Sequence, residues 1–454
     1  MKVALVFPRF KYPSGDPPVG LCYIASSILK HTNAEVDIID TTFDKDPMKH
    51  IENAFKEKKY DYAGFSVMTS TLKDSNNVAK LIKKLSPETK IVYGGPHATI
   101  MAEDTIKIPE VDAIALKEGE ETFVEVTKKK GNFKGVKGIW YKENGKVIKN
   151  PEREPMKNID QIPFPSRELV DMEKYIANWY QLDAVSTNLR GTGLIASRGC
   201  PYRCSYCQPI LDEMFGRKMR KRSARNIVDE MKFLKETYNI NAFLYLDDTF
   251  TIDSKWVNEV CDLMIAEELN MSWGCNSRAH LVKEELFAKM QKAGLKQVFI
   301  GMESGSQRVL DDVYQKDIKV DQVYQGVKIL NKLDVKVLGY FMIGAPTETE
   351  AEIKQTINYA KKLDIHQATF SVTTPLPLTH LYNRTEHLIS GDVEDMDYYK
   401  NPMYKAGAQT LSPKRIQYWK RRALLEFYLH PKRIPSTIKQ LLSVRKALNK
   451  LKRF

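Results

Sequence analysis

The stretch Ser197-Arg-Gly-Cys200-Pro-Tyr-Arg-Cys204-Ser-Tyr-Cys207 places three cysteines on one short loop, separated by three and then two residues. The apolar run before it, Gly193-Leu-Ile-Ala-Ser197, predicts a buried strand. The loop therefore follows the end of a strand, which is where barrels of parallel strands carry their reactive groups. We expect this loop to be the centre of the protein's chemistry.

Thiolates are soft ligands that suit iron–sulfur clusters or zinc. Three thiolates at this spacing can hold three irons of a cubane cluster, which leaves the fourth iron open to a small molecule. A structural zinc site requires four ligands, and the nearest further candidates, Cys275 and His280, lie far along the chain. The spacing therefore favours a 4Fe–4S cluster over zinc.

The bulk composition indicates a soluble protein of two or three domains. The chain has 454 residues, and 43% of them are hydrophobic, which is enough for sizeable cores. No apolar run approaches the ~20 residues of a membrane span. The first residues, 1–7, predict a strand and not a signal peptide, so we expect a cytoplasmic location. The remaining cysteines, Cys22, Cys261 and Cys275, lie in apolar context and are expected to be core residues.

The first 150 residues predict a doubly wound, parallel α/β domain, because short apolar runs alternate with amphipathic ones. The predicted strands are 3–7, 36–39, 62–67, 91–93 and 113–115, and the predicted helices are 20–31, 48–58, 75–85 and 121–129. A hairpin pattern with a turn at Glu143-Asn-Gly145 follows. Such sheets bind ligands beyond the carboxyl ends of their strands.

Residues 151–165 are rich in proline and charge, and we predict that residues 151–189 form a linker. Residues 190–375 alternate strands and helices again. The predicted strands are 193–197, 242–246, 273–275, 298–301, 339–343 and 369–372. Residues 376–454 are expected to form a basic, mainly helical C-terminal region.

The motif C-x3-C-x-aromatic-C, with Tyr206 before the last cysteine, resembles that of the radical S-adenosylmethionine (SAM) superfamily. The resemblance implies a partial (β/α)6 barrel and a 4Fe–4S cluster on Cys200, Cys204 and Cys207, with SAM on the open iron. In that family an electron from the cluster breaks a C–S bond of SAM and yields a 5′-deoxyadenosyl radical. An electron donor such as ferredoxin or flavodoxin is then an implied partner.

Polar strings at the predicted strand ends resemble the same family: Asp247-Asp248-Thr-Phe250, Asn276-Ser-Arg278, Glu303-Ser-Gly305 and Gly344-Ala-Pro346. Carried over by position, the SAM contacts would be Tyr206, Asp247, Asp248, Arg278, Glu303 and Ser304. The two aspartates would support the SAM amino group, Arg278 its carboxylate, and Glu303 with Ser304 its ribose or carboxylate. The alternatives are an ion pair between Arg278 and Asp248 or Glu303, and a plain turn at 344–346.

The first domain resembles the cobalamin-binding domain of one radical SAM subfamily, the anaerobic magnesium-protoporphyrin monomethyl ester cyclase-like proteins. The matching stretches are 18–25, 64–66, 94–99 and 118–122. The resemblance implies corrin contacts from Ser66, Thr69, Gly94, Gly95 and Thr99, although the two glycines are also explained by a tight turn. The D-x-H-x-x-G motif is absent from residues 9–15. We therefore expect the cobalt to be bound without a histidine ligand from the protein. His97 is the histidine whose role as a cobalt ligand has to be excluded.

The combined pattern predicts a cobalamin-dependent radical SAM enzyme that methylates, oxidises or rearranges an unactivated carbon of a small or hydrophobic substrate. One alternative is a tRNA-modifying radical SAM enzyme such as a methylthiotransferase. That class carries additional N-terminal cysteines, and here only Cys22 is present. A second alternative is a non-catalytic corrinoid-binding or metal-binding protein, which the full set of strand-end residues disfavours.

The C-terminal residues 412–454 carry thirteen lysines and arginines against one glutamate, a net charge of +12 out of +13 for the chain. Two apolar sets recur at helical spacing: Ile416, Trp419, Ala423 and Phe427, and then Ile438, Leu441, Leu442 and Leu448. Three interpretations fit a basic amphipathic segment: contact with an anionic membrane, which implies a lipid substrate, contact with RNA, or a helical cap. RNA is the least favoured.

Overall fold

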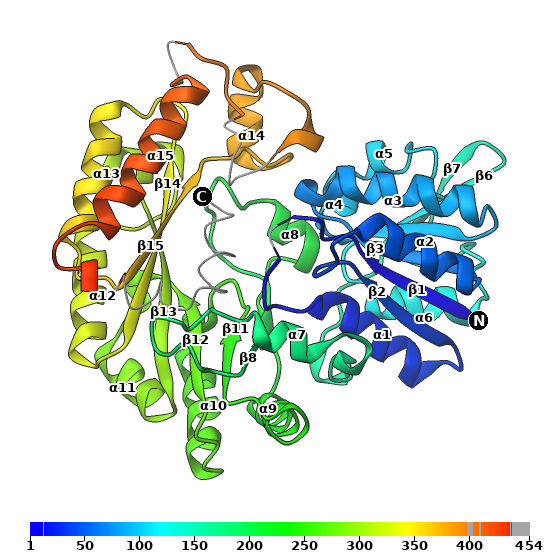
Figure 1. The fold of residues 1–454 in the computed structure, drawn as a ribbon, viewed down its shortest axis with the longest axis horizontal. Coiled ribbons are helices and arrows are strands. Elements are labelled where there is room, and N and C mark those ends of the chain that lie inside the picture. Colours follow the sequence, from blue (N-terminus) through cyan, green and yellow to red (C-terminus); the bar gives the residue numbers. More distant parts are fainter. Residues whose placement is uncertain (12, 397–402, 408–409, 436, 438–454) are drawn as a thin grey trace. The chain divides into compact units, whose positions relative to one another are not determined.

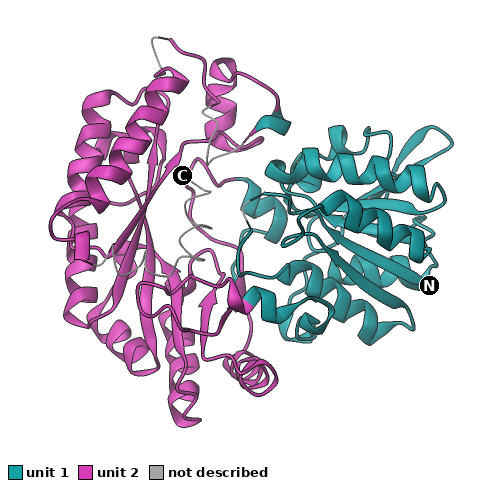
Figure 2. Cartoon of the chain, in the orientation of Figure 1, with its two compact units in different colours: residues 1–175, 209–220, 393–395 teal, residues 176–208, 221–392, 396–454 magenta. Residues whose placement is uncertain are grey.

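The computed structural model describes all residues except 12, 397–402, 408–409, 436 and 438–454 (Figure 1). The chain forms two compact units (Figure 2). The first comprises Met1–Tyr175, Pro209–Arg220 and Val393–Asp395, and the second comprises Ile176–Gln208, Lys221–Asp392 and Met396–Phe454. Among the described residues, none of the helices has the length and apolar character that crossing a membrane requires.

The first unit is built on a seven-stranded sheet of order β2-β1-β3-β4-β5-β6-β7. Strands β1 to β5 are parallel, and β6 and β7 form an antiparallel hairpin at one edge. The hairpin turn has positive φ at both Asn144 and Gly145, as its sequence predicts. The strands are β1 (Lys2–Phe7), β2 (Glu35–Asp40), β3 (Tyr62–Ser66), β4 (Lys90–Gly94), β5 (Ala113–Ala115), β6 (Ile139–Glu143) and β7 (Lys146–Lys149).

Helices cover both faces of this sheet, which explains why the parallel strands are apolar on both sides. One face packs residues of α2 and α3, such as Phe55 and Val78, against Ala4 and Val6 of β1. The other face packs α1 and α6 against Val3 and Leu5 of the same strand. The helices are α1 (Val19–His31), α2 (Pro47–Glu57), α3 (Leu72–Leu85), α4 (Gly95–Ile100), α5 (Ala102–Thr105), α6 (Glu120–Lys128), α7 (Met172–Ala177, which ends in the second unit) and α8 (Ile210–Phe215).

The second unit is a curled half-barrel of six parallel strands of order β15-β14-β13-β12-β11-β8, so that neighbours in space are neighbours along the chain. The predicted fold class is thereby confirmed. The strands are β8 (Gly191–Leu194), β11 (Ala242–Tyr245), β12 (Ser272–Ser277), β13 (Leu295–Glu303), β14 (Lys336–Ile343) and β15 (Gln367–Val372). Two short strands, β9 (Ser197–Arg198) and β10 (Arg220–Lys221), form a separate ladder.

The first barrel strand differs from its prediction of 193–197. It begins and ends earlier, and Ser197 belongs instead to β9. The Ala196 amide and the Ser197 hydroxyl donate to the Asp247 carboxylate, which draws this segment off the barrel sheet. Gly191 has no room for a side chain, because a Cβ there would overlap the ring of buried Trp179.

Helices that follow the barrel strands form a layer along the sheet (Figure 1). They are α9 (Ala224–Tyr238), α10 (Ser254–Ala266), α11 (Glu284–Lys292), α12 (Val320–Lys332) and α13 (Glu350–Lys362). Two further helices, α14 (His380–Thr385) and α15 (Pro413–Tyr428), come after β15.

Helix α15 corresponds to the first apolar set of the basic C-terminal region. Ile416, Trp419, Ala423 and Phe427 are all buried, and α15 packs beside β15 and α13. The hydroxyl of Tyr428 also donates to the carbonyl of Ala368 at 2.9 Å. This apolar face is therefore used by the second unit as a helical cap and is not free to enter a membrane. The second apolar set, Ile438 to Leu448, lies outside the described residues.

Candidate functional site

The cysteine loop follows β8 and β9 and is fastened to the segments that follow β13 and β15. The Ser205 hydroxyl donates to the carbonyl of Val313 at 2.6 Å, and the Ser205 amide donates to the carbonyl of Tyr314 at 2.8 Å. The Leu381 amide donates back to the Ser205 carbonyl at 2.8 Å. The position of the three thiols is thus set by residues more than 100 positions later in the chain.

The three thiols of the motif are available as ligands. None of the three forms a disulfide: Cys204 is buried, and Cys200 and Cys207 are half-buried. Among the described residues, no three cysteine, histidine or carboxylate side chains converge on one point as the ligands of one metal ion would. Burial raises the pKa of Cys200 and Cys207, so ligation must displace their protons.

Arg278, at the end of β12, contacts the loop directly. One Nη donates to the Cys204 sulfur at 3.2 Å, and the guanidinium lies 3.8 Å from the centre of the Tyr202 ring. The other Nη donates to the carbonyls of Lys316 and Asp317. In the described part of the chain, Arg278 forms no ion pair with Asp248 or Glu303, so that alternative is wrong.

Buried Glu303 and Lys316 form a triad with half-buried Tyr206. Lys316 donates from Nζ to Glu303 Oε1 at 2.8 Å and to the Tyr206 hydroxyl at 2.8 Å, and that hydroxyl donates to the same carboxylate oxygen at 3.0 Å. Burial and the Glu303 charge raise the pKa of Tyr206 well above its usual value. The triad fixes the aromatic residue of the cysteine motif to β13.

The backbone at Glu303 is strained. Its φ is +57°, in the region that favours glycine, and the register with β14 shifts between Gly301 and Glu303. Such a conformation costs about 1–3 kcal/mol in a residue with a side chain. Strain of this kind is typical of functional sites, where a side chain has to be held in one direction.

The two aspartates after β11 have different surroundings. Both carboxylate oxygens of buried Asp247 accept hydrogen bonds, from the Ala196 amide at 3.0 Å and from the Ser197 hydroxyl. Asp248 retains exposed surface, and its carboxylate has no hydrogen-bond partner among the described residues. The surrounding protein displaces water from both carboxyl groups, and this desolvation raises the pKa of each to about 6. Of the pair, only Asp248 has a carboxylate free for a ligand.

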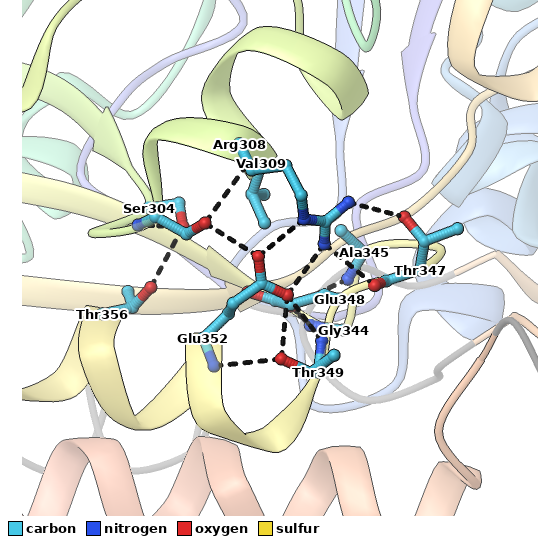
Figure 3. Close-up of polar contacts among 11 residues, drawn as sticks. Ser304, Arg308, Val309, Gly344, Ala345, Thr347, Glu348, Thr349, Glu352 and Thr356 are labelled. Atoms are coloured by element: carbon cyan, nitrogen blue, oxygen red, sulfur yellow. Dashed lines mark hydrogen bonds and ion pairs between the residues drawn. The ribbon is translucent and has the colours of Figure 1, made fainter.

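Ser304 and the turn after β14 are occupied by structural contacts (Figure 3). Ser304 is buried and bonds Thr356 through their hydroxyls at 3.1 Å. Arg308 forms a two-point ion pair with Glu352, at 2.8 and 2.7 Å. Glu348 accepts from the amides of Gly344 and Ala345 at 2.7 and 3.0 Å, and burial raises its pKa to about 7. The interpretation of residues 344–346 as a turn is therefore correct.

Lys316 is the main site residue that the sequence analysis missed. It is buried, yet its sequence neighbours Gln315 and Asp317 are polar. The chain between Glu303 and Lys316 includes a π-helical turn at Val309–Val313. Such turns are frequent at functional sites, but no sequence pattern used above predicts them.

In the first unit, the predicted corrin contacts lie at the carboxyl ends of β3 and β4. Ser66 ends β3, Gly94 ends β4, and Gly95 and Thr99 belong to α4. Thr99 donates to the Gly95 carbonyl at 3.1 Å and accepts from the Lys117 amide at 2.9 Å. Thr69 bonds the Nδ1 atom of buried His97 at 3.1 Å, and burial lowers the pKa of His97 to about 4.

The two glycines have separate explanations. Gly95 has φ of +87°, and a Cβ there would meet the Val67 amide nitrogen at 2.9 Å, so the turn itself requires glycine. Gly94 has an extended backbone, and a Cβ would meet only ordinary contacts at 3.5 Å or beyond. The turn interpretation therefore accounts for Gly95 and not for Gly94.

Comparison with known proteins agrees with this division of the chain. The model of the radical SAM superfamily matches residues 194–360, and that of the B12 binding domain matches residues 11–127. An uncharacterized methyltransferase of Pyrococcus horikoshii is 35% identical over 447 residues, which span 95% of this chain and 93% of that protein. The anaerobic magnesium-protoporphyrin IX monomethyl ester cyclase of Rubrivivax gelatinosus is 26% identical over 415 residues, which span 88% and 72%.

The solved structure of the radical SAM methyltransferase TsrM from Kitasatospora setae, with cobalamin and a 4Fe–4S cluster bound, has a TM-score of 0.71 at 16% identity. The match covers 85% of this chain and 78% of TsrM. The chain belongs to the radical SAM proteins that carry an N-terminal B12-binding domain. It is an enzyme of the radical SAM type, and the predicted family is confirmed.

Proposed function

We propose that this protein is a cobalamin-dependent radical SAM methyltransferase that transfers a methyl group to an unactivated carbon of a small molecule. The observation that carries the proposal is the cysteine loop, whose three cysteines form no disulfide and whose Tyr206 is bonded to Glu303 of the half-barrel. Similarity to proteins named as methyltransferases supports methylation. Ferredoxin or flavodoxin is the proposed class of electron donor.

The proposed roles follow from which side-chain atoms of the site already have hydrogen-bond partners and which do not. Cys200, Cys204 and Cys207 would hold a 4Fe–4S cluster, and the free carboxylate of Asp248 would receive the SAM amino group. Tyr206, held by Glu303 and Lys316, would fix the loop beside the bound SAM. When bound, the cluster and SAM supply a 5′-deoxyadenosyl radical, and the corrinoid supplies the methyl group. The contacts of Asp247 and Ser304 point to supporting roles.

Oxidation or ring closure is the second candidate reaction, which the similarity to the cyclase favours. A methylthiotransferase role has less support. Cys22 is buried in α1, and burial raises its pKa to about 12, so it is a poor ligand for a second cluster.

The proposal is tested by anaerobic reconstitution with iron, sulfide, cobalamin, SAM and a reductant. A methyltransferase of this type is expected to produce both 5′-deoxyadenosine and S-adenosylhomocysteine, because one SAM supplies the radical and another the methyl group. 5′-Deoxyadenosine without S-adenosylhomocysteine would favour oxidation or ring closure. Neither product, in a preparation with full iron content, would contradict the proposed function.

The corrinoid is expected to bind without a histidine below the cobalt. His97 is 3% exposed and bonded to Thr69, so its imidazole is not free to reach a ligand. Electron paramagnetic resonance (EPR) of the Co(II) form should therefore lack nitrogen splitting, and the His97→Ala variant should give the same spectrum. Splitting that disappears in His97→Ala would refute this prediction, and a failure to retain any corrinoid would refute the cobalamin assignment.

A further inference from the structure

Arg278 makes a contact that its predicted role does not explain. The family resemblance predicts that this arginine contacts the SAM carboxylate. Its Nη instead donates to the Cys204 sulfur at 3.2 Å, and both residues are buried, with 5% and 6% of their surface exposed. A charge-assisted hydrogen bond in such surroundings is stronger than one in water.

The guanidinium is held in one orientation. Its plane lies over the Tyr202 ring at 3.8 Å, and the Tyr202 hydroxyl is itself 3.0 Å from Nε2 of His280. Its second Nη donates hydrogen bonds to the carbonyls of Lys316 and Asp317. Only Nε is buried without an acceptor among the described residues.

We propose that Arg278 sets the reduction potential of the iron–sulfur cluster through its hydrogen bond to the Cys204 sulfur. The inference rests on the cluster of the proposed function. One-electron reduction adds negative charge to the cluster and its thiolates. A cation that donates a hydrogen bond to a ligand sulfur stabilises the reduced form more than the oxidised form, which makes the potential less negative.

The test is the midpoint potential of the reconstituted cluster, followed by EPR in a redox titration without SAM. Arg278→Met replaces the arginine side chain by an uncharged side chain of similar length that has no hydrogen-bond donors. We expect the equilibrium constant for reduction to fall about tenfold, which corresponds to a potential about 59 mV more negative. Arg278→Lys keeps the charge but not the planar fork, so a smaller shift in the same direction is expected. Arg308→Met, which removes an arginine paired with Glu352, is the control and should leave the potential unchanged.

The outcomes separate this proposal from its alternatives. An unchanged potential in both Arg278 variants, together with weakened SAM binding, would overturn it and return Arg278 to the SAM carboxylate. If Arg278→Met does not retain a cluster, the shift of the midpoint potential in Arg278→Lys decides between the proposal and its alternative. A wild-type protein that assembles no cluster would refute the proposed function, and this inference with it.

Discussion

Replacing Cys204 by alanine is expected to abolish the iron–sulfur cluster, and the same result is expected for Cys200 and Cys207. Three thiolates are the full set of protein ligands in the proposed site, and removing one leaves an iron without a protein ligand. Iron content and visible absorbance after anaerobic reconstitution should fall to the background of the apoprotein. Formation of 5′-deoxyadenosine should disappear with them.

Cys261→Ala provides the matched control. Cys261 is buried in α10, where burial raises the pKa of its thiol to about 12, so it behaves as a small core residue. This variant should keep the iron content of the wild type. If Cys261→Ala or Cys22→Ala loses as much iron as Cys204→Ala, the ligand assignment is wrong.

Lys316→Met is expected to be the most destabilising single change among those considered. It leaves the Glu303 carboxylate buried without its cation, and breaking a buried pair in this way costs about 3–5 kcal/mol. A loss of this size should lower the midpoint of thermal unfolding on the order of 10 °C. The double variant Glu303→Gln with Lys316→Met removes the orphaned charge and should recover most of the loss.

Lys319→Met is the control for that experiment. Lys319 lies three residues away, and its pair with Asp311, at 3.0 Å, is exposed to solvent. An exposed pair contributes about 0–1 kcal/mol. Equal midpoints for Lys316→Met and Lys319→Met would show that Glu303 does not depend on Lys316.

The fold was readily predicted because its strands are nearly continuous apolar runs that alternate with amphipathic helices. β5 matched its predicted bounds, and the other parallel strands of the first sheet, β1 to β4, were found within one residue at each end. The prediction failed where a side chain distant in sequence decides the backbone. After β8, hydrogen bonds from Ala196 and Ser197 to Asp247 take Ser197 out of the barrel sheet. A local sequence pattern cannot predict an acceptor that lies fifty residues away.

The site was predictable in its location and not in its contacts. The polar residues at strand ends do gather at one edge of the half-barrel, since parallel strands place their carboxyl ends together. Which atoms remain free depends on neighbours brought in by the fold. Asp247 and Asp248 are adjacent in sequence, yet both carboxylate oxygens of the first accept hydrogen bonds, and the carboxylate of the second has no partner among the described residues. Lys316 was missed for the same reason.

The anchoring of the cysteine loop has a consequence for biosynthesis. Three contacts of this loop are made with residues that are synthesised much later. The partners of Cys204, Tyr206 and Ser205 lie 74, 97 and 108 residues further along the chain. At a synthesis rate of about 5–20 residues per second, roughly 5–20 s separate the emergence of the thiols from that of Val313. During this interval the nascent chain presents three thiols before the residues that bury them exist. The barrel can therefore shield the three thiols only after Val313 has been synthesised.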